Sequence, residues 1–149
     1  MNATSQQLLD KMIGGVERFV KHRAEAVAED IQVAIILTPK PIWTGLYSSG
    51  WEITFDTPAE PKELPEGHSD LAWDMWESKC TPYRPPPYPQ IEVHHVDFPT
   101  AYQTVYFTNP YPHAAMIEHE GSPCHTEPWK VAANAQDRVL RDTTLTVPF

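Results

Sequence analysis

The chain has 149 residues, a length that fits one domain, and its 20 acidic and 11 basic side chains give a formal net charge of −9. Such an acidic chain is unsuited to gripping DNA, because affinity for DNA comes largely from neutralising phosphates, although it could surround a duplex without binding it. With only two cysteines, the sequence does not predict a disulfide framework. It has no basic start followed by an apolar run, as a secretory signal would have, and no apolar window long enough for a membrane span.

The first predicted element is a long amphipathic helix over residues 5–37, which ends before the prolines at 39 and 41. Ser5 is the expected N-cap, and a Gly14-Gly15 pair leaves open whether there is one helix or two. The nearly all-apolar residues 31–37 predict either helical turns buried on all sides or a chain that has already become a strand. The apolar residues recur at spacings of three and four: Leu8, Leu9, Met12, Val16, Phe19, Val20, Val27, Ile31, Ala34 and Ile35.

A tight turn and a strand are predicted next. Gly45 permits a sharp return of the chain after the helix. The alternating run "WEITFDT" over residues 51–57 predicts a half-buried strand. Ser48 and Ser49 are expected to lead into it. Trp51 is expected to pin the strand against the helix, with a loss of about 3–5 kcal/mol on truncation to alanine.

The middle of the chain, residues 57–100, is predicted to be a loop-rich insertion. Six of the chain's 16 prolines lie between residues 82 and 99. Residues 81–90, "TPYRPPPYPQ", lack the backbone donors of a helix or central strand and are expected to be extended. A short helix is predicted over 69–79, and a strand or sheet edge over 91–98.

The C-terminal part is predicted to contain a strand over residues 101–109, then a turn with a short helical or extended piece. A second helix follows over 126–143, with Thr126 as its cap and Pro128 in its first turn. Residues 143–149, "TLTVPF" after a threonine, are expected to form an extended tail.

Together these elements predict a single α+β domain over residues 1–149. A long N-terminal helix and a C-terminal helix are expected to pack on one face of a small antiparallel β-sheet, with the proline-rich insertion as an arm.

The sequence carries no strong catalytic signature. It has no phosphate-binding glycine loop, and "SSG" at 48–50 lacks the context of a nucleophile elbow. Glu118 and Glu120 favour a solvated charged run over an acid–base pair. One alternative remains open, a small metal-dependent hydrolase that uses His113, His119 and His125 with neighbouring carboxylates.

Two segments resemble a known family. The segment "TPKPIWTGLYSSGWEI", with Trp51 six residues after Gly45, is similar to the sequence motif "TPVDTGRLRxxW" of the tail-completion or neck proteins of tailed bacteriophages. "VYFTNPYPHAAMIEHEGS" over 105–122 is similar to that family's "Y-I-T-N-x-x-P-Y-A-x-x-L-E-Y-G-x-S". His113 replaces the family's tyrosine, and Leu46 and Tyr47 stand where arginine is frequent. The residues in register are Asn109, Pro112, Ala114, Ile117, Glu118, Gly121 and Ser122.

The resemblance implies a non-enzymatic virion protein, assembled in the host cytoplasm, without cofactor or membrane. It implies a cyclic ring at the head–tail junction that contacts other neck, connector or tail proteins, with DNA passing through its lumen. The insertion and the tail have no predicted core to bury them and are candidate contact surfaces. A third reading is a binding module that offers "PYRPPPYP" to an aromatic groove. The candidate interface residues are Tyr83, Arg84, Pro86, Tyr88, Leu145, Val147 and Phe149.

Overall fold

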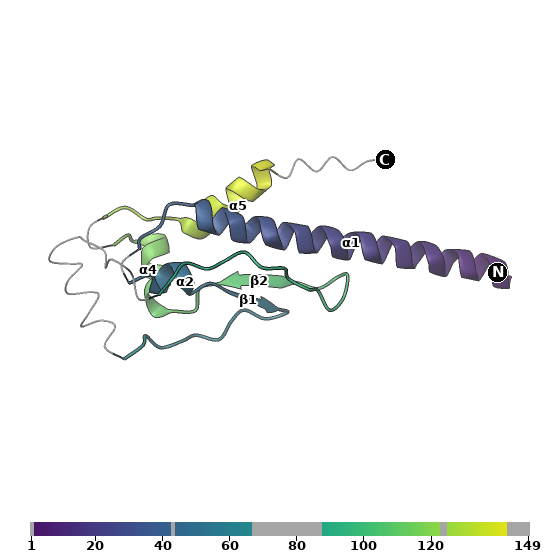
Figure 1. Ribbon diagram of the computed structural model, residues 1–149, viewed down its shortest axis with the longest axis horizontal. Coiled ribbons are helices and arrows are strands. Elements are labelled where there is room, and N and C mark those ends of the chain that lie inside the picture. Colours follow the sequence, from purple (N-terminus) through teal and green to yellow (C-terminus); the bar gives the residue numbers. More distant parts are fainter. Residues whose placement is uncertain (1, 43, 67–87, 123–124, 143–149) are drawn as a thin grey trace.

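The computed structural model describes residues 2–42, 44–66, 88–122 and 125–142. It confirms the predicted α+β class, with a long N-terminal helix, a C-terminal helix and a small antiparallel sheet (Figure 1). The predicted helix 69–79, most of the extended segment 81–90 and the tail 143–149 lie outside the described residues.

Helix α1 runs from Ala3 to Leu37 without a break, so the glycine pair does not divide it. The prediction that Ser5 is its N-cap is wrong. Asn2 is the cap, and its side-chain oxygen accepts the Ser5 N–H at 2.9 Å. Two prolines after Leu37 disfavour a further helical turn, as the sequence predicted.

The last turns of α1 are helical rather than a strand, and they are buried on one side only. Ala34 and Ile35 are each 2% exposed, whereas Val33 is 40% and Leu37 is 57% exposed. The C-terminal carbonyls receive donors from outside the helix. The Lys40 ammonium donates to the carbonyls of residues 35, 36 and 38 at 2.7, 2.8 and 3.1 Å. Burial lowers the pKa of Lys40.

The chain after α1 forms a one-turn helix, α2 (Leu46–Ser49), before it enters the sheet. Ser48 and Ser49, which were expected to lead into the strand, therefore belong to a helical turn that is separated from it by two residues. Their hydroxyls donate to the carbonyls of Gly45 and Leu46 at 3.0 and 3.2 Å, which satisfies them within the helical turn.

Strands β1 (Glu52–Phe55) and β2 (Val105–Thr108) form a two-stranded antiparallel sheet with Ile53 opposite Phe107 and Phe55 opposite Val105. Both strands are shorter than predicted. β1 ends where Asp56 adopts a φ of 66°, a left-handed conformation that leaves the strand path. The four paired apolar side chains pack with Ala24 and Ala28 of α1 and with Val96 and Phe98.

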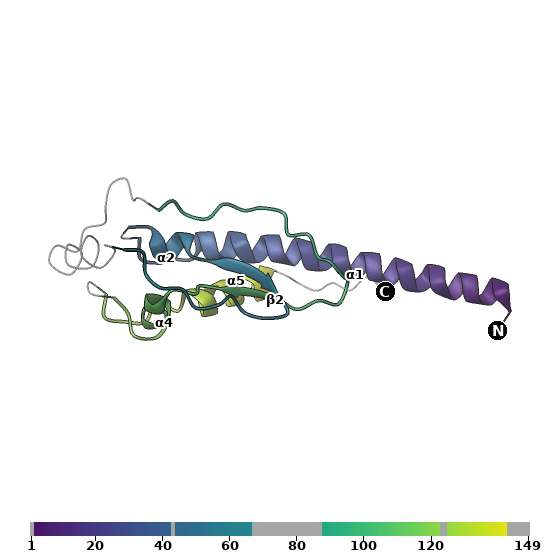
Figure 2. The same cartoon turned by 90° about the horizontal axis from the view of Figure 1, so that it is seen from below.

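Residues 91–98 are not a strand. They run alongside α1 (Figure 2), and α1 side chains take up backbone bonds that a sheet partner would have made. The Gln32 amide donates to the His94 carbonyl at 2.8 Å and accepts from the His94 N–H at 3.0 Å. The Glu25 carboxylate accepts from the Phe98 N–H at 3.3 Å.

The C-terminal region contains α4 (Pro112–His119) and α5 (Val131–Asp142). The predicted start of the last helix at Thr126 and Pro128 is wrong by about a turn. The Trp129 N–H instead donates to the Ile117 carbonyl at 3.0 Å, and this bond ties the chain to α4 before α5 begins. α5 then packs along the C-terminal half of α1 (Figure 1), where Ala135 joins Ala34 and Ile35 in one cluster.

Candidate functional site

The two segments that carry the family resemblance meet at one junction. The Asn109 amide donates to the Tyr47 carbonyl at 2.9 Å, and the Asn109 side-chain oxygen accepts from the Tyr111 N–H at 3.4 Å. A Cβ on Gly50 would lie 2.8 Å from the Tyr111 ring and 3.0 Å from the Asn109 side-chain oxygen. Residues about 60 positions apart in the sequence are therefore in direct contact.

Gly45, in the turn before α2, is a position that requires glycine for two independent reasons. Its φ is 86°, a conformation that favours glycine. A Cβ at this position would also lie 1.7 Å from the Tyr88 carbonyl oxygen. The Tyr88 N–H donates to the Thr44 carbonyl at 2.9 Å, so the end of the proline-rich insertion is fastened to the turn. Tyr88, a candidate interface residue, is thus half-buried in its own chain.

Trp51 joins the junction to α1 as expected, although its indole is only half-buried. It packs against the cluster of Tyr47, Ala114, Ile117 and Val131, and also against the cluster that includes Ala34, Ile35 and Ala135. Its indole N–H is buried and has no acceptor among the described residues. Trp51 is therefore a packing wedge between α1, α2 and α4.

Glu118 has a structural role that the sequence did not predict. Its carboxylate accepts the backbone N–H groups of Ala132 at 3.1 Å and of Ala133 at 3.3 Å, two donors in the first turn of α5. Burial, and then the Glu118 carboxylate, raise the pKa of the Tyr47 phenol. Glu118 is thus the N-terminal cap of α5, supplied by α4.

Pro112 and Gly121 delimit α4. Pro112 is the first residue of the helix, where its missing N–H costs no hydrogen bond. Gly121 has a φ of 111° and donates its N–H to the Met116 carbonyl at 3.0 Å. A Cβ there would lie 2.4 Å from the His125 carbonyl oxygen. Pro112 and Gly121 therefore set the two ends of α4.

The three histidines of the hydrolase alternative do not converge on one ion site. His113 is 8% exposed and packs edge-on to the Tyr47 ring at 6.1 Å, whereas His119 and His125 are exposed. The His125 ring stacks on Trp129 with 4.3 Å between ring centroids.

A different group does converge in the described parts of the chain, namely Glu25, His95 and Asp97, whose ligand atoms lie within 4.8 Å of one another. The Lys21 ammonium lies 3.3 Å from the Asp97 carboxylate and 3.8 Å from that of Glu25, so these acids already have a cationic partner. A hydrogen bond to Glu29 is the main cause that raises the pKa of His95, and the charges of Glu25, Glu29 and Asp97 add to it.

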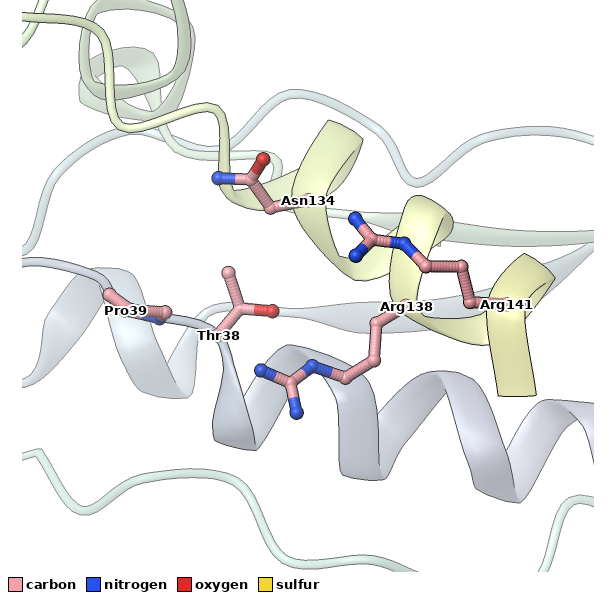
Figure 3. Close-up of a pocket in the computed structure, with 5 residues that line it drawn as sticks. All are labelled: Thr38, Pro39, Asn134, Arg138 and Arg141. Carbon is pink, nitrogen blue, oxygen red and sulfur yellow. The ribbon is translucent and has the colours of Figure 1, made fainter.

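A polar pocket of about 430 Å³ lies where the end of α1 meets α5 (Figure 3). Thr38 and Pro39 line one side, and Asn134, Arg138 and Arg141 of α5 line the other. Two guanidinium groups suit a carboxylate or phosphate, but both arginines are solvent-exposed. The pocket therefore offers a weak anion contact on an acidic protein, and no spacing of residues in the sequence predicts it.

The remaining candidate interface residues, Tyr83, Arg84, Pro86, Leu145, Val147 and Phe149, lie outside the described residues. Among the described residues, none of the helices combines the length and apolar character needed to span a membrane. Comparisons with protein families, curated proteins and solved structures gave no match to this chain.

Proposed function

We propose that this chain is a non-enzymatic structural subunit of the neck of a tailed bacteriophage, of the tail-completion type, which forms a ring at the head–tail junction. One observation carries the proposal. The two segments that resemble that family are distant in sequence, yet they are fitted to each other through the residues that form the resemblance. The Asn109 amide donates to the Tyr47 carbonyl, and Gly50 allows a close approach of Tyr111 and Asn109 that a side chain would block.

The chemistry of the motif residues supports a scaffold. Glu118 caps α5, Pro112 starts α4, and Gly121 ends the α4 turn, so each has a packing or capping role. A net charge of −9 suits a ring through which DNA passes without being held. A cyclic ring follows from heterologous contacts that close by rotation.

The proposal is tested by removing the chain from the phage that encodes it. We expect filled heads and complete tails to accumulate separately, because a neck subunit is needed to join them. Added wild-type protein should restore joining in the lysate, and electron microscopy of the product should place the chain between portal and tail. Infectious particles without the chain, or density for it elsewhere in the virion, would overturn the proposal.

A matched pair of variants separates the junction from general surface changes. Asn109→Ala removes the bond to the Tyr47 carbonyl, whereas Gln103→Ala removes an amide bond to the exposed Asp56 carboxylate at 2.8 Å. We expect loss of joining activity with Asn109→Ala and retention with Gln103→Ala. Circular dichroism of both proteins reports whether the fold is retained. Equal joining by both proteins would contradict a role for the junction in the neck.

A further inference from the structure

The apolar stripe of α1 continues onto helical turns that the rest of the fold leaves uncovered. Leu8, Met12, Val16 and Phe19 are 60%, 61%, 55% and 59% exposed. Both views show the N-terminal part of α1 extending well beyond the sheet and α5 (Figures 1 and 2). We call the apolar face of residues 8–20 the ridge. A contiguous exposed apolar face of this kind is typical of an interaction surface.

The same stripe forms one wall of an apolar groove further along the helix. The groove has a volume of about 400 Å³ and lies between Val27 and Ile31 of α1, Val105 of β2, and Val139 and Leu140 of α5. Leu140 is 65% exposed although it lines this groove. We call this site the groove.

Ridge and groove lie end to end on one helix, since apolar residues continue at spacings of three and four from residue 9 to residue 31. A second copy turned antiparallel about an axis across α1, near residues 20–23, would place its ridge on this groove. The same rotation would place this ridge on the groove of the second copy. The surface is therefore self-complementary, as a two-fold contact requires.

The distribution of charge favours contact of the ridge with the remainder of a second copy over contact between two ridges. Residues 2–24 contain four basic and two acidic side chains, a formal charge of +2. The other residues contain seven basic and eighteen acidic side chains, a formal charge of −11. The N-terminal part of α1 is therefore attracted to the body of a second copy and repelled by the same part of that copy.

We propose that two copies of this chain associate with the ridge of each in the groove of the other. The proposal concerns the free protein and does not rest on the assignment to a phage neck. It makes the uncovered half of α1 an interface helix whose partner is a second copy of the chain.

The association is tested by sedimentation velocity and light scattering of the full chain over a concentration series. Wild-type protein is expected to pass from monomer to dimer. Val16→Glu in the ridge and Leu140→Glu in the groove should each raise the dissociation constant at least about 30-fold, as for a central interface residue. Gln7→Glu adds the same charge on the polar side of α1 and is expected to leave the dissociation constant unchanged.

A mixing experiment distinguishes this arrangement from the others. Val16→Glu retains an intact groove and Leu140→Glu retains an intact ridge. An equimolar mixture should therefore dimerise at concentrations where each variant alone stays monomeric. Circular dichroism checks that both variants keep the wild-type fold. Three results would overturn the proposal: wild-type protein that stays monomeric, Leu140→Glu protein that dimerises with the wild-type dissociation constant, or a ridge that binds phosphatidylserine vesicles while the protein remains monomeric.

Discussion

The two halves of α1 share one helix and one apolar pattern but differ in what covers them. In the C-terminal half, Ala28 and Ile35 are 1% and 2% exposed, because the sheet, residues 91–98 and α5 all pack there. In the N-terminal half, Leu8 and Phe19 are 60% and 59% exposed. An amphipathic period therefore identifies a surface that favours burial, but the packing of the remaining chain decides whether that surface is buried.

The covered half also has polar anchors that the uncovered half lacks among the described residues. Gln32 is 1% exposed and bonds the backbone of His94 with both ends of its amide. Glu25 bonds the Phe98 N–H, and Lys40 caps the helix. These bonds fix the direction of neighbouring segments. The C-terminal half of α1 therefore both packs in the core and orients the segments around it.

The largest expected contrast is between two phenylalanines. Phe98 is 1% exposed and packs edge-on to Phe55, with 5.2 Å between the ring centroids. Phe98→Ala should therefore destabilise the protein by about 3–5 kcal/mol. Phe19→Ala removes the same side chain from the ridge and should change the free energy of unfolding by less than about 0.5 kcal/mol. Urea unfolding at low protein concentration, where the chain is monomeric, measures both. Similar losses would show that the ridge is covered within the chain.

Two glycines give the next contrast. Gly45→Ala introduces a Cβ at a φ of 86° and 1.7 Å from the Tyr88 carbonyl oxygen, so we expect a loss of at least about 2–3 kcal/mol. Gly14→Ala lies within α1, where the new Cβ would meet only the Arg18 side chain at 3.5 Å. It should stabilise the helix by about 0.5–1 kcal/mol. Thermal unfolding of both variants tests the pair, and a stabilising Gly45→Ala would contradict the observed turn.

A smaller contrast concerns two glutamates at the end of α4. Glu118→Ala removes the acceptor of the first α5 donors and should cost about 1–2 kcal/mol. Glu120→Ala changes an exposed residue nearby and should cost less than about 0.5 kcal/mol. The free energy of urea unfolding distinguishes them. Equal effects would mean that the α5 cap does not stabilise the folded state.

The smallest expected effect is a pH dependence at His95. Because Glu29, Glu25 and Asp97 raise its pKa, the folded state binds the proton more tightly than the unfolded state. The resulting stabilisation is complete below about pH 6.5, the unfolded pKa of histidine, and is lost as pH rises through the higher folded pKa.

The difference in melting temperature between wild type and His95→Gln measures this effect across the pH range. It should be largest at acidic pH and shrink as pH rises. The exposed His22, in α1, serves as the control through His22→Gln. A difference that grows with pH would have the wrong sign for this interaction.

Part of the candidate site could be predicted from local sequence. The turn at Gly45 was predicted, and its φ of 86° fits that turn, whereas Gly121, with a φ of 111°, was named only through the family resemblance. The close approach of Tyr88 to Gly45 could not be predicted, because it joins residues more than 40 positions apart. The capping role of Glu118 was also missed, since its partners lie on the next helix.

Local patterns along the chain are enough to predict four features: the apolar period of α1, the prolines after it, the turn at Gly45 and the alternation in β1 and β2. Contacts between distant segments set the others, since residues 91–98 bond to α1 side chains rather than to a strand, and α5 begins at Val131. Such contacts also leave the N-terminal half of the α1 stripe exposed among the described residues. Local preferences fix backbone conformation, whereas burial and hydrogen-bond partners come from segments far apart in the chain.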